Sequence, residues 1–266
     1  MILHTIESGQ GPPVALLHGL FGSARNLGAV QRALAPEFRV LAMDLRNHGA
    51  SPHAAAMDYP AMAADVLDTL DQRAALPAAL VGHSMGGKAA MMAALLHPEH
   101  VSRLVVADIA PVAYEHHNAE IAAALAAIPL SPGLTRVAAD AALADAVPDP
   151  GLRAFLLQNL APGAHPAWRI GLREIASAMP VIEGWEPPPP DLAYRGPTLF
   201  VAGAASDYVR VEYRPAIRAL FPVARFVTLK NAGHWLHADN PDGFISVLAA
   251  FLSGGGSPGT QAATAR

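Results

Sequence analysis

Short apolar runs alternate with helical patterns along most of this chain, and this alternation constrains the fold more than any other feature. Each apolar run leads into a polar loop punctuated by glycine, as in VALLHG and AALVGHS. A short apolar run bounded by turn residues is typical of a buried strand. Such runs begin near residues 13, 38, 78, 101, 197 and 224. Helical patterns lie between them, at residues 23–35, 59–76, 86–100, 211–221 and 240–252. The chain is therefore predicted to be α/β, with a mostly parallel central sheet covered by helices on both faces.

The alternation of strand and helix patterns stops between residues 112 and 191, where no strand pattern is found. This segment contains alanine-rich helical pieces and ends in the stiff sequence EPPPPD. We expect residues 112–191 to form a helical cap inserted into a core made of residues 1–111 and 192–252. The cap would cover the carboxyl edge of the sheet, where open α/β sheets bind ligands. Residues 253–266 are of low complexity, which predicts a disordered tail.

Composition excludes several classes of function. The chain has 266 residues, a net charge of −4, two lysines and no cysteine. It has no basic stripe for nucleic acid, no thiolate ligands or disulfides, and no apolar stretch of about 18 residues that could span a membrane. Neither a secretory signal nor a phosphate loop nor a dinucleotide fingerprint is visible. We expect a soluble, cytoplasmic protein without metal or cofactor, whose partner is a small molecule.

The sequence Gly82-His83-Ser84-Met85-Gly86 matches the pattern G-x-S-x-G. In a nucleophile elbow the serine occupies a strained turn between a strand and a helix, and side chains two residues away on either side would clash. Here an apolar run precedes the motif and a run of good helix formers follows it. Ser84 is therefore the predicted nucleophile.

A serine hydroxyl needs a base and an oxyanion site. His234, in NAGHWLHAD after the last predicted strand, has the late position that the histidine takes in this type of site. We expect His237 to pack locally. The N–H of Met85 should be one oxyanion donor, and the N–H of Leu20 the other, with Phe21 as the alternative.

Several stretches resemble the YbfF-type esterases of the α/β-hydrolase superfamily. They include HGLFGSARNLG, DLRNHGASPH, GHSMGGKAAM, VVADIAPVAY and NAGHWLHADNPD, and the likeness extends from about residue 13 to residue 252. The resemblance implies an α/β-hydrolase fold with a small helical cap. It also implies a serine esterase that acts on short-chain acyl esters and, as a further option, on acyl thioesters.

Two aspartates compete for the role of the triad acid. Most members of the superfamily carry the acid in a G-x-x-D-x-x-V loop, but in this chain the aspartate position holds Ser206, and Asp207 falls one residue late. Asp108 ends the strand that follows the nucleophile helix, and the resemblance to YbfF-type esterases implies an acid there. We take Asp108 as the acid and keep Asp207 as the alternative.

Other residues receive weaker assignments. We expect Asp44 to anchor the loop that contains Arg46, Asn47 and His48, and Lys88 to brace a loop, with binding of a substrate anion as the alternative. The aromatic candidates for the substrate pocket are Phe21, Tyr114, Trp168, Trp185 and Tyr208.

Competing functions stay open at this point. The same triad could serve a C–C bond hydrolase, a perhydrolase or an amidase, and a receptor could keep the fold without turnover. Dehalogenases and epoxide hydrolases of this fold need aspartate at the nucleophile position, so Ser84 argues against both. Fold alone does not assign a substrate.

Overall fold

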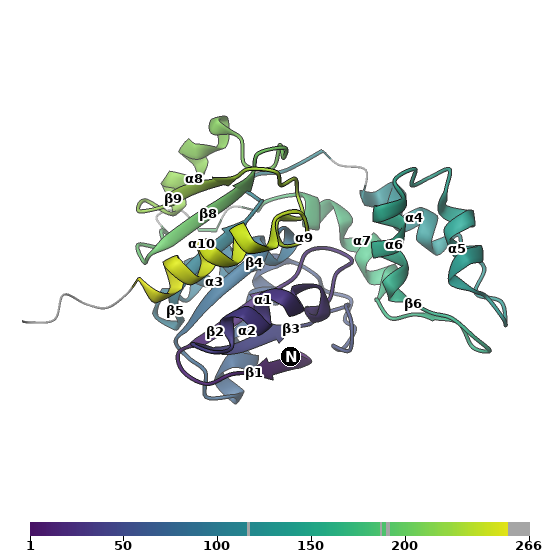
Figure 1. The fold of residues 1–266 in the computed structure, drawn as a ribbon, viewed down its shortest axis with the longest axis horizontal. Coiled ribbons are helices and arrows are strands. Elements are labelled where there is room, and N and C mark those ends of the chain that lie inside the picture. Colours follow the sequence, from purple (N-terminus) through teal and green to yellow (C-terminus); the bar gives the residue numbers. More distant parts are fainter. Residues whose placement is uncertain (116–117, 187, 190–191, 255–266) are drawn as a thin grey trace, which may run out of the picture.

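A seven-stranded sheet forms the centre of the molecule (Figure 1). The structure, a computed structural model, describes residues 1–115, 118–186, 188–189 and 192–254. The strands are β1 (Thr5–Ser8), β2 (Pro13–Leu17), β3 (Arg39–Met43), β4 (Ala78–His83), β5 (Val101–Ala107), β8 (Thr198–Gly203) and β9 (Arg225–Leu229). Their order across the sheet is β1-β3-β2-β4-β5-β8-β9. All neighbours are parallel except β1, which pairs antiparallel with β3. The predicted α/β class with a mostly parallel sheet is confirmed.

Helices cover both faces of this sheet. They are α1 (Gly28–Leu34), α2 (Tyr59–Gln72), α3 (Met85–Leu96), α8 (Arg214–Leu220), α9 (Leu236–Asp239) and α10 (Pro241–Ser253), with short 3-10 turns at Ala24–Leu27, Pro98–His100 and Val211–Tyr213. Val14 and Leu16 of β2 belong to the apolar cluster of α1 and α10, whereas Ala15 and Leu17 belong to that of α2 and α3. A strand buried on both faces must be apolar at every position, which explains the unbroken run in β2.

Local sequence sets where the helices begin and end. The Asp58 side chain caps α2 by accepting a hydrogen bond from the N–H of Ala61 at 2.7 Å. Helix α3 ends at Leu96, short of the predicted residue 100, because Pro98 disfavours helical backbone in the residue before it. Helix α2 likewise ends at Gln72, four residues before the predicted end.

The segment between β5 and β8 is mainly helical. It contains α4 (Asn118–Ala126), α5 (Arg136–Leu143), α6 (Pro150–Leu156) and α7 (Leu172–Glu183), which we call the cap helices, and a 3-10 turn at Leu157–Asn159. Figure 1 shows the cap helices grouped at one side of the sheet.

Two expectations need correction. The segment is not free of strands, because β6 (Leu160–Ala161) and β7 (Ala167–Trp168) pair as an antiparallel hairpin. Two-residue strands are too short to leave an alternating pattern in the sequence. Helix α10 includes Ser253, the first residue of the expected tail, and residues 255–266 lie outside the described residues.

Within the described part of the chain, no helix combines the length and the hydrophobicity that a membrane span requires.

Candidate active site

The residues predicted for catalysis follow different strands and meet at one edge of the sheet. Leu20 follows β2, Ser84 follows β4, Asp108 follows β5 and His234 follows β9. Because these strands are parallel, their carboxyl ends lie at the same edge, and groups far apart in sequence can meet there.

Ser84 occupies a strained turn between β4 and α3. Its backbone has φ 52° and ψ −120°, a conformation that residues with a side chain rarely adopt. A Cβ on Gly82 would lie 2.2 Å from the carbonyl oxygen of Gly86, and a Cβ on Gly86 would lie 2.5 Å from that of His18. The two glycines are thus required by close backbone contact, which is the clash that the motif predicts.

Asp108 is fully buried and contacts the predicted base. His234 Nδ1 donates to Asp108 Oδ2 at 2.8 Å. The backbone N–H of Gly203 donates to Oδ1 at 3.0 Å. The Ser206 hydroxyl also donates to Oδ2. Like Ser84, Asp108 has a positive φ, 53°. The carboxylate is therefore fixed by three donors, one of which is the candidate base.

Asp207, the alternative acid, lies elsewhere. Its side chain is 86% exposed and forms an ion pair with Arg210 at 3.6 Å. Ser206 occupies the position where most of the superfamily has aspartate, and it contributes a hydroxyl to Asp108 instead. The one-residue offset noted in the sequence thus turns the Asp207 carboxylate towards solvent.

His234 is held from several sides. Its carbonyl oxygen accepts a hydrogen bond from His83 Nε2 at 2.8 Å. Its ring stacks on Tyr208 with ring centres 3.9 Å apart. His237 lies in α9 with its ring 5.0 Å from that of His83, and burial lowers the pKa of His237 to about 4. His237 packs locally, as expected, although it also faces the cavity described below.

The loop after β2 presents the candidate oxyanion donors. The N–H of Phe21 already donates to His48 Nε2 at 3.1 Å, so this bond takes the N–H that was the alternative donor. Among the described residues no acceptor is found for the N–H of Leu20, and Met85 is the first residue of α3, whose N–H has no partner within the helix. The N–H groups of Leu20 and Met85 therefore have no acceptor among the described residues, as the predicted oxyanion donors require.

Two buried histidines, His18 and His48, fix the loop after β2. The sequence did not identify them as anchors. His48 Nδ1 donates to the carbonyl of Arg46 at 2.9 Å while Nε2 accepts from Phe21. His18 bonds the carbonyl of Gly19 through Nδ1 and the N–H of Leu45 through Nε2. Burial lowers the pKa of His18, and it lowers the pKa of His48 to about 3. Both rings are therefore neutral hydrogen-bonding anchors. Their positions after strands, in HG and NHG, are the sequence signal.

Asp44 anchors the neighbouring loop, as expected. It is 4% exposed and accepts hydrogen bonds from the N–H groups of Ala24 and Ala50, at 2.7 and 2.9 Å.

Lys88 connects the nucleophile helix to the end of cap helix α7. Its ammonium donates to the carbonyls of Glu183 and Gly184, at 3.1 and 2.6 Å, and lies 3.5 Å from that of Ile182. The Tyr59 hydroxyl donates to the same Ile182 carbonyl at 2.5 Å. Burial lowers the pKa of Lys88 to about 7. Lys88 thus braces the cap, and its amine is engaged with backbone carbonyls rather than pointing freely at a substrate.

A cavity of about 240 Å³ lies over Ser84 and His234. Its apolar lining includes Leu20, Phe21, Ile109, Ile121, Leu152, Phe155, Ile182 and Trp235. Its polar lining includes Tyr59, Lys88, Tyr114, Asn118, Glu183 and Tyr208.

Three of the predicted aromatic residues line this cavity, namely Phe21, Tyr114 and Tyr208. Trp168 and Trp185 do not. Trp168 pairs with Leu160 in the cap hairpin, and the ring of Trp185 packs 6.1 Å from that of Tyr59. Apolar residues of a small helical segment can pack within it as readily as they line a ligand site, and sequence does not separate the two cases.

One group of side chains in the described residues has metal-ligand spacing. His97, Glu99 and His100 bring their ligand atoms within 4.8 Å of one another on the turn after α3. None of the three lines the cavity over Ser84.

Comparison with known proteins gives consistent relatives. The family model described as the alpha/beta hydrolase fold matches residues 12–241. Esterase YbfF of Escherichia coli is 40% identical over 242 residues, covering 91% of this chain and 93% of that protein. The sn-1-specific diacylglycerol lipase ABHD11 of Mus musculus is 41% identical, covering 91% and 81%. Among solved structures, a marine microorganism esterase is 36% identical with a TM-score of 0.90, covering 94% of this chain and 99% of that one.

Proposed function

The chain belongs to the α/β-hydrolase family as a carboxylic ester hydrolase of the YbfF type, and from this premise we propose that it cleaves short-chain acyl esters through an acyl-enzyme on Ser84. In this proposal His234 is the general base and Asp108 is the triad acid. The observation that carries it is the 2.8 Å hydrogen bond from His234 Nδ1 to the buried Asp108 carboxylate, beside a serine in an elbow conformation.

The reaction would proceed in two halves. Ser84 Oγ attacks the ester carbonyl carbon while His234 Nε2 takes the hydroxyl proton. The tetrahedral intermediate collapses, the bond to the alcohol oxygen breaks, and His234 returns the proton to the leaving alcohol. Water then attacks the acyl-enzyme with His234 again as the base, which releases the carboxylic acid and restores Ser84.

Electrostatics would support both halves. The Asp108 carboxylate holds the tautomer with hydrogen on Nδ1 and stabilises the imidazolium that forms. The N–H groups of Leu20 and Met85 would bind the oxyanion, and each such donor typically lowers the barrier by about 3 kcal/mol.

The cavity supports a small acyl group. Its volume of about 240 Å³ is smaller than that of most ligand pockets, which commonly measure about 300–1,000 Å³. Apolar side chains such as Leu20, Phe21 and Ile109 form part of its lining, which suits an alkyl chain. Esters and thioesters react through the same steps, so a thioester substrate belongs to the same proposal. We also propose a cytoplasmic location, with which a chain that has no cysteine is compatible.

The test is hydrolysis of p-nitrophenyl esters from acetate to long acyl chains. We expect turnover with a short-chain optimum, and a loss of about 10⁴-fold or more in Ser84→Ala. A fluorophosphonate probe should label the wild type and leave Ser84→Ala unlabelled. Wild-type turnover in Ser84→Ala would overturn the proposal.

A further inference from the structure

A second cavity lies beside the candidate active site, between the core and the cap helices. Its volume is about 810 Å³. Phe21 and Asn26 line both cavities, so the loop after β2 and the 3-10 turn that follows it separate one cavity from the other. Asn26 Nδ2 donates to Gln158 Oε1 at 3.0 Å, and Asn159 Nδ2 donates to the carbonyl of Phe21 at 2.7 Å. The cap is therefore joined to the loop after β2 along the boundary between the two cavities.

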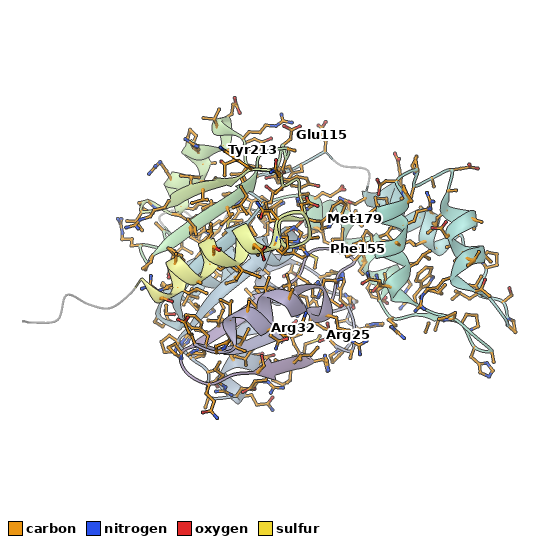
Figure 2. The ribbon with its side chains drawn as sticks, in the orientation of Figure 1. Arg25, Arg32, Glu115, Phe155, Met179 and Tyr213 are labelled. Carbon is orange, nitrogen blue, oxygen red and sulfur yellow. The ribbon has the colours of Figure 1, made fainter. Side chains whose placement is uncertain are left out.

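Three arginines line this second cavity, namely Arg25, Arg136 and Arg169, and we call it the arginine cleft. Arg25 comes from the turn before α1, whereas Arg136 and Arg169 come from α5 and from the residue after β7. Figure 2 shows Arg25 at the side of the core that faces the cap helices. Within the described part of the chain, none of the three has a carboxylate oxygen within ion-pair distance.

The donors of these arginines are largely unused. Arg136 gives Nε and Nη2 to the carbonyls of Leu157 and Leu160, at 3.3 and 3.0 Å, which leaves its other terminal nitrogen available. For the side chains of Arg25 and Arg169 no hydrogen bond to another described residue is found, and each guanidinium carries five N–H donors.

The negative charge in the cleft lining is already satisfied. Among the described residues Asp44 is the one carboxylate that lines it, and His4 lies beside it. Asp44 accepts from two backbone N–H groups and contacts His4 Nδ1 at 2.9 Å. Three exposed arginines therefore line one concave space whose carboxylate is already hydrogen-bonded, in a protein whose net charge is −4.

We propose that the arginine cleft is a phosphate-binding subsite for the leaving group of the ester or thioester substrate. Guanidinium forks match phosphate oxygens in geometry and charge. The cleft shares Phe21 and Asn26 with the cavity over Ser84, so in this proposal the acyl group lies over Ser84 and the alcohol or thiol part crosses the boundary at Asn26 towards Arg25. The inference rests on the proposed function for the identity of the reacting bond.

Matched substrate pairs test this subsite. The first pair is S-butyryl-4′-phosphopantetheine against S-butyryl-pantetheine, and the second is butyryl-glycerol 3-phosphate against monobutyrin. In each pair the acyl group and the reacting bond are the same and only the phosphates differ. We expect kcat/KM to be about 10 to 100 times higher for the phosphate-bearing member of at least one pair, since hydrogen bonds to charged groups have that magnitude. The pair that shows the preference identifies the source of the phosphate.

The variant is the double substitution Arg25→Gln/Arg169→Gln, and the control is Arg32→Gln. Arg32 is an exposed arginine of α1 that lines neither cavity and lies farther from the cap helices in Figure 2. The double variant should lose the phosphate preference and keep p-nitrophenyl butyrate hydrolysis within about twofold, whereas Arg32→Gln should keep both. Added salt should weaken the preference in the wild type.

Calorimetric titration with coenzyme A and with glycerol 3-phosphate separates the subsite from the reaction. Binding to the wild type and to Ser84→Ala, but not to the double variant, supports the subsite even where no ester is hydrolysed. A wild type without phosphate preference that binds neither compound, or a double variant that keeps the preference, overturns the subsite. If the wild type shows no phosphate preference and binds neither compound but still turns over p-nitrophenyl butyrate, the subsite is wrong and the proposed function still holds.

Discussion

Replacing Asp108 with asparagine should disable the proposed triad by reversing one hydrogen bond. The carboxylate accepts from Gly203 N–H at Oδ1 and from His234 Nδ1 at Oδ2. A backbone N–H cannot turn into an acceptor, so the asparagine oxygen must take the Oδ1 position. Its NH₂ group then occupies the Oδ2 position and donates to His234 Nδ1. The ring is forced to carry its hydrogen on Nε2, where it cannot accept the Ser84 proton.

The expected loss is large, because the wrong tautomer cannot act as a base. The same substitution in a serine protease triad lowers kcat by about 10⁴-fold. This corresponds to about 5 kcal/mol of barrier. Ser206 can rotate its hydroxyl to accept from the new NH₂ group, so no buried polar group need lose its partner and the fold should survive.

The assay is kcat/KM for p-nitrophenyl butyrate, with thermal unfolding as a check on folding. The matched control is Asp207→Asn, which should stay within about twofold of wild type because that side chain is 86% exposed and away from His234. Near-wild-type turnover of Asp108→Asn, or a loss of several orders of magnitude in Asp207→Asn, would refute the reasoning.

Two further predictions concern the supports of the site. Lys88 has a folded pKa of about 7 and an unfolded pKa near 10.4, so between these values the unfolded chain binds more protons and stability rises with pH. The free energy of unfolding of wild type relative to Lys88→Met should therefore increase by about 2 kcal/mol from pH 7 to pH 9 in urea titrations; a constant difference would contradict the buried amine. His48→Phe leaves the N–H of Phe21 without an acceptor. This should lower the free energy of unfolding by about 1–3 kcal/mol and lower kcat on p-nitrophenyl butyrate about tenfold or more. His48→Gln keeps an acceptor and should recover part of the stability and part of kcat.

Sequence predicted the fold well where burial imposes a pattern. Strands β2 to β5 and β8 lie inside the sheet and are largely buried, so each appears as an apolar run that cannot be confused with a loop. Strand β9 is an edge strand and only partly buried, but its run of β-forming residues was still predicted. Strand β1 was not predicted, because TIES is a four-residue edge strand, only partly buried and with polar residues at three of its four positions. The hairpin of β6 and β7 was missed for a related reason, since two residues cannot show a period.

The candidate site was predictable where a local motif fixes the geometry, as at Ser84. The choice of acid was harder, because a pattern locates a loop but not the direction of a side chain within it. Two neighbouring residues of one loop point in different ways: Ser206 faces the buried Asp108 and Asp207 faces solvent. The arginine cleft was not foreseen at all. Arg25 and Arg169 are 144 residues apart in the chain, and only the docking of the cap on the core brings them to one space.

The histidines around the cavity show why three-dimensional contacts decide between a base and an anchor. His18 and His48 use both ring nitrogens in hydrogen bonds to backbone groups, so neither has a lone pair for a proton. Among the described residues the His83 ring has one hydrogen-bond partner, the carbonyl of His234 at Nε2, and burial lowers the pKa of His83 well below its ordinary value. A carbonyl can orient a ring but offers no full charge to balance an imidazolium. His234 instead has a carboxylate at Nδ1 and, among the described residues, no bond at Nε2. Among these histidines, His234 therefore has the contacts that the proposed general base requires: a carboxylate that accepts from Nδ1 and an Nε2 that is left for the Ser84 hydroxyl.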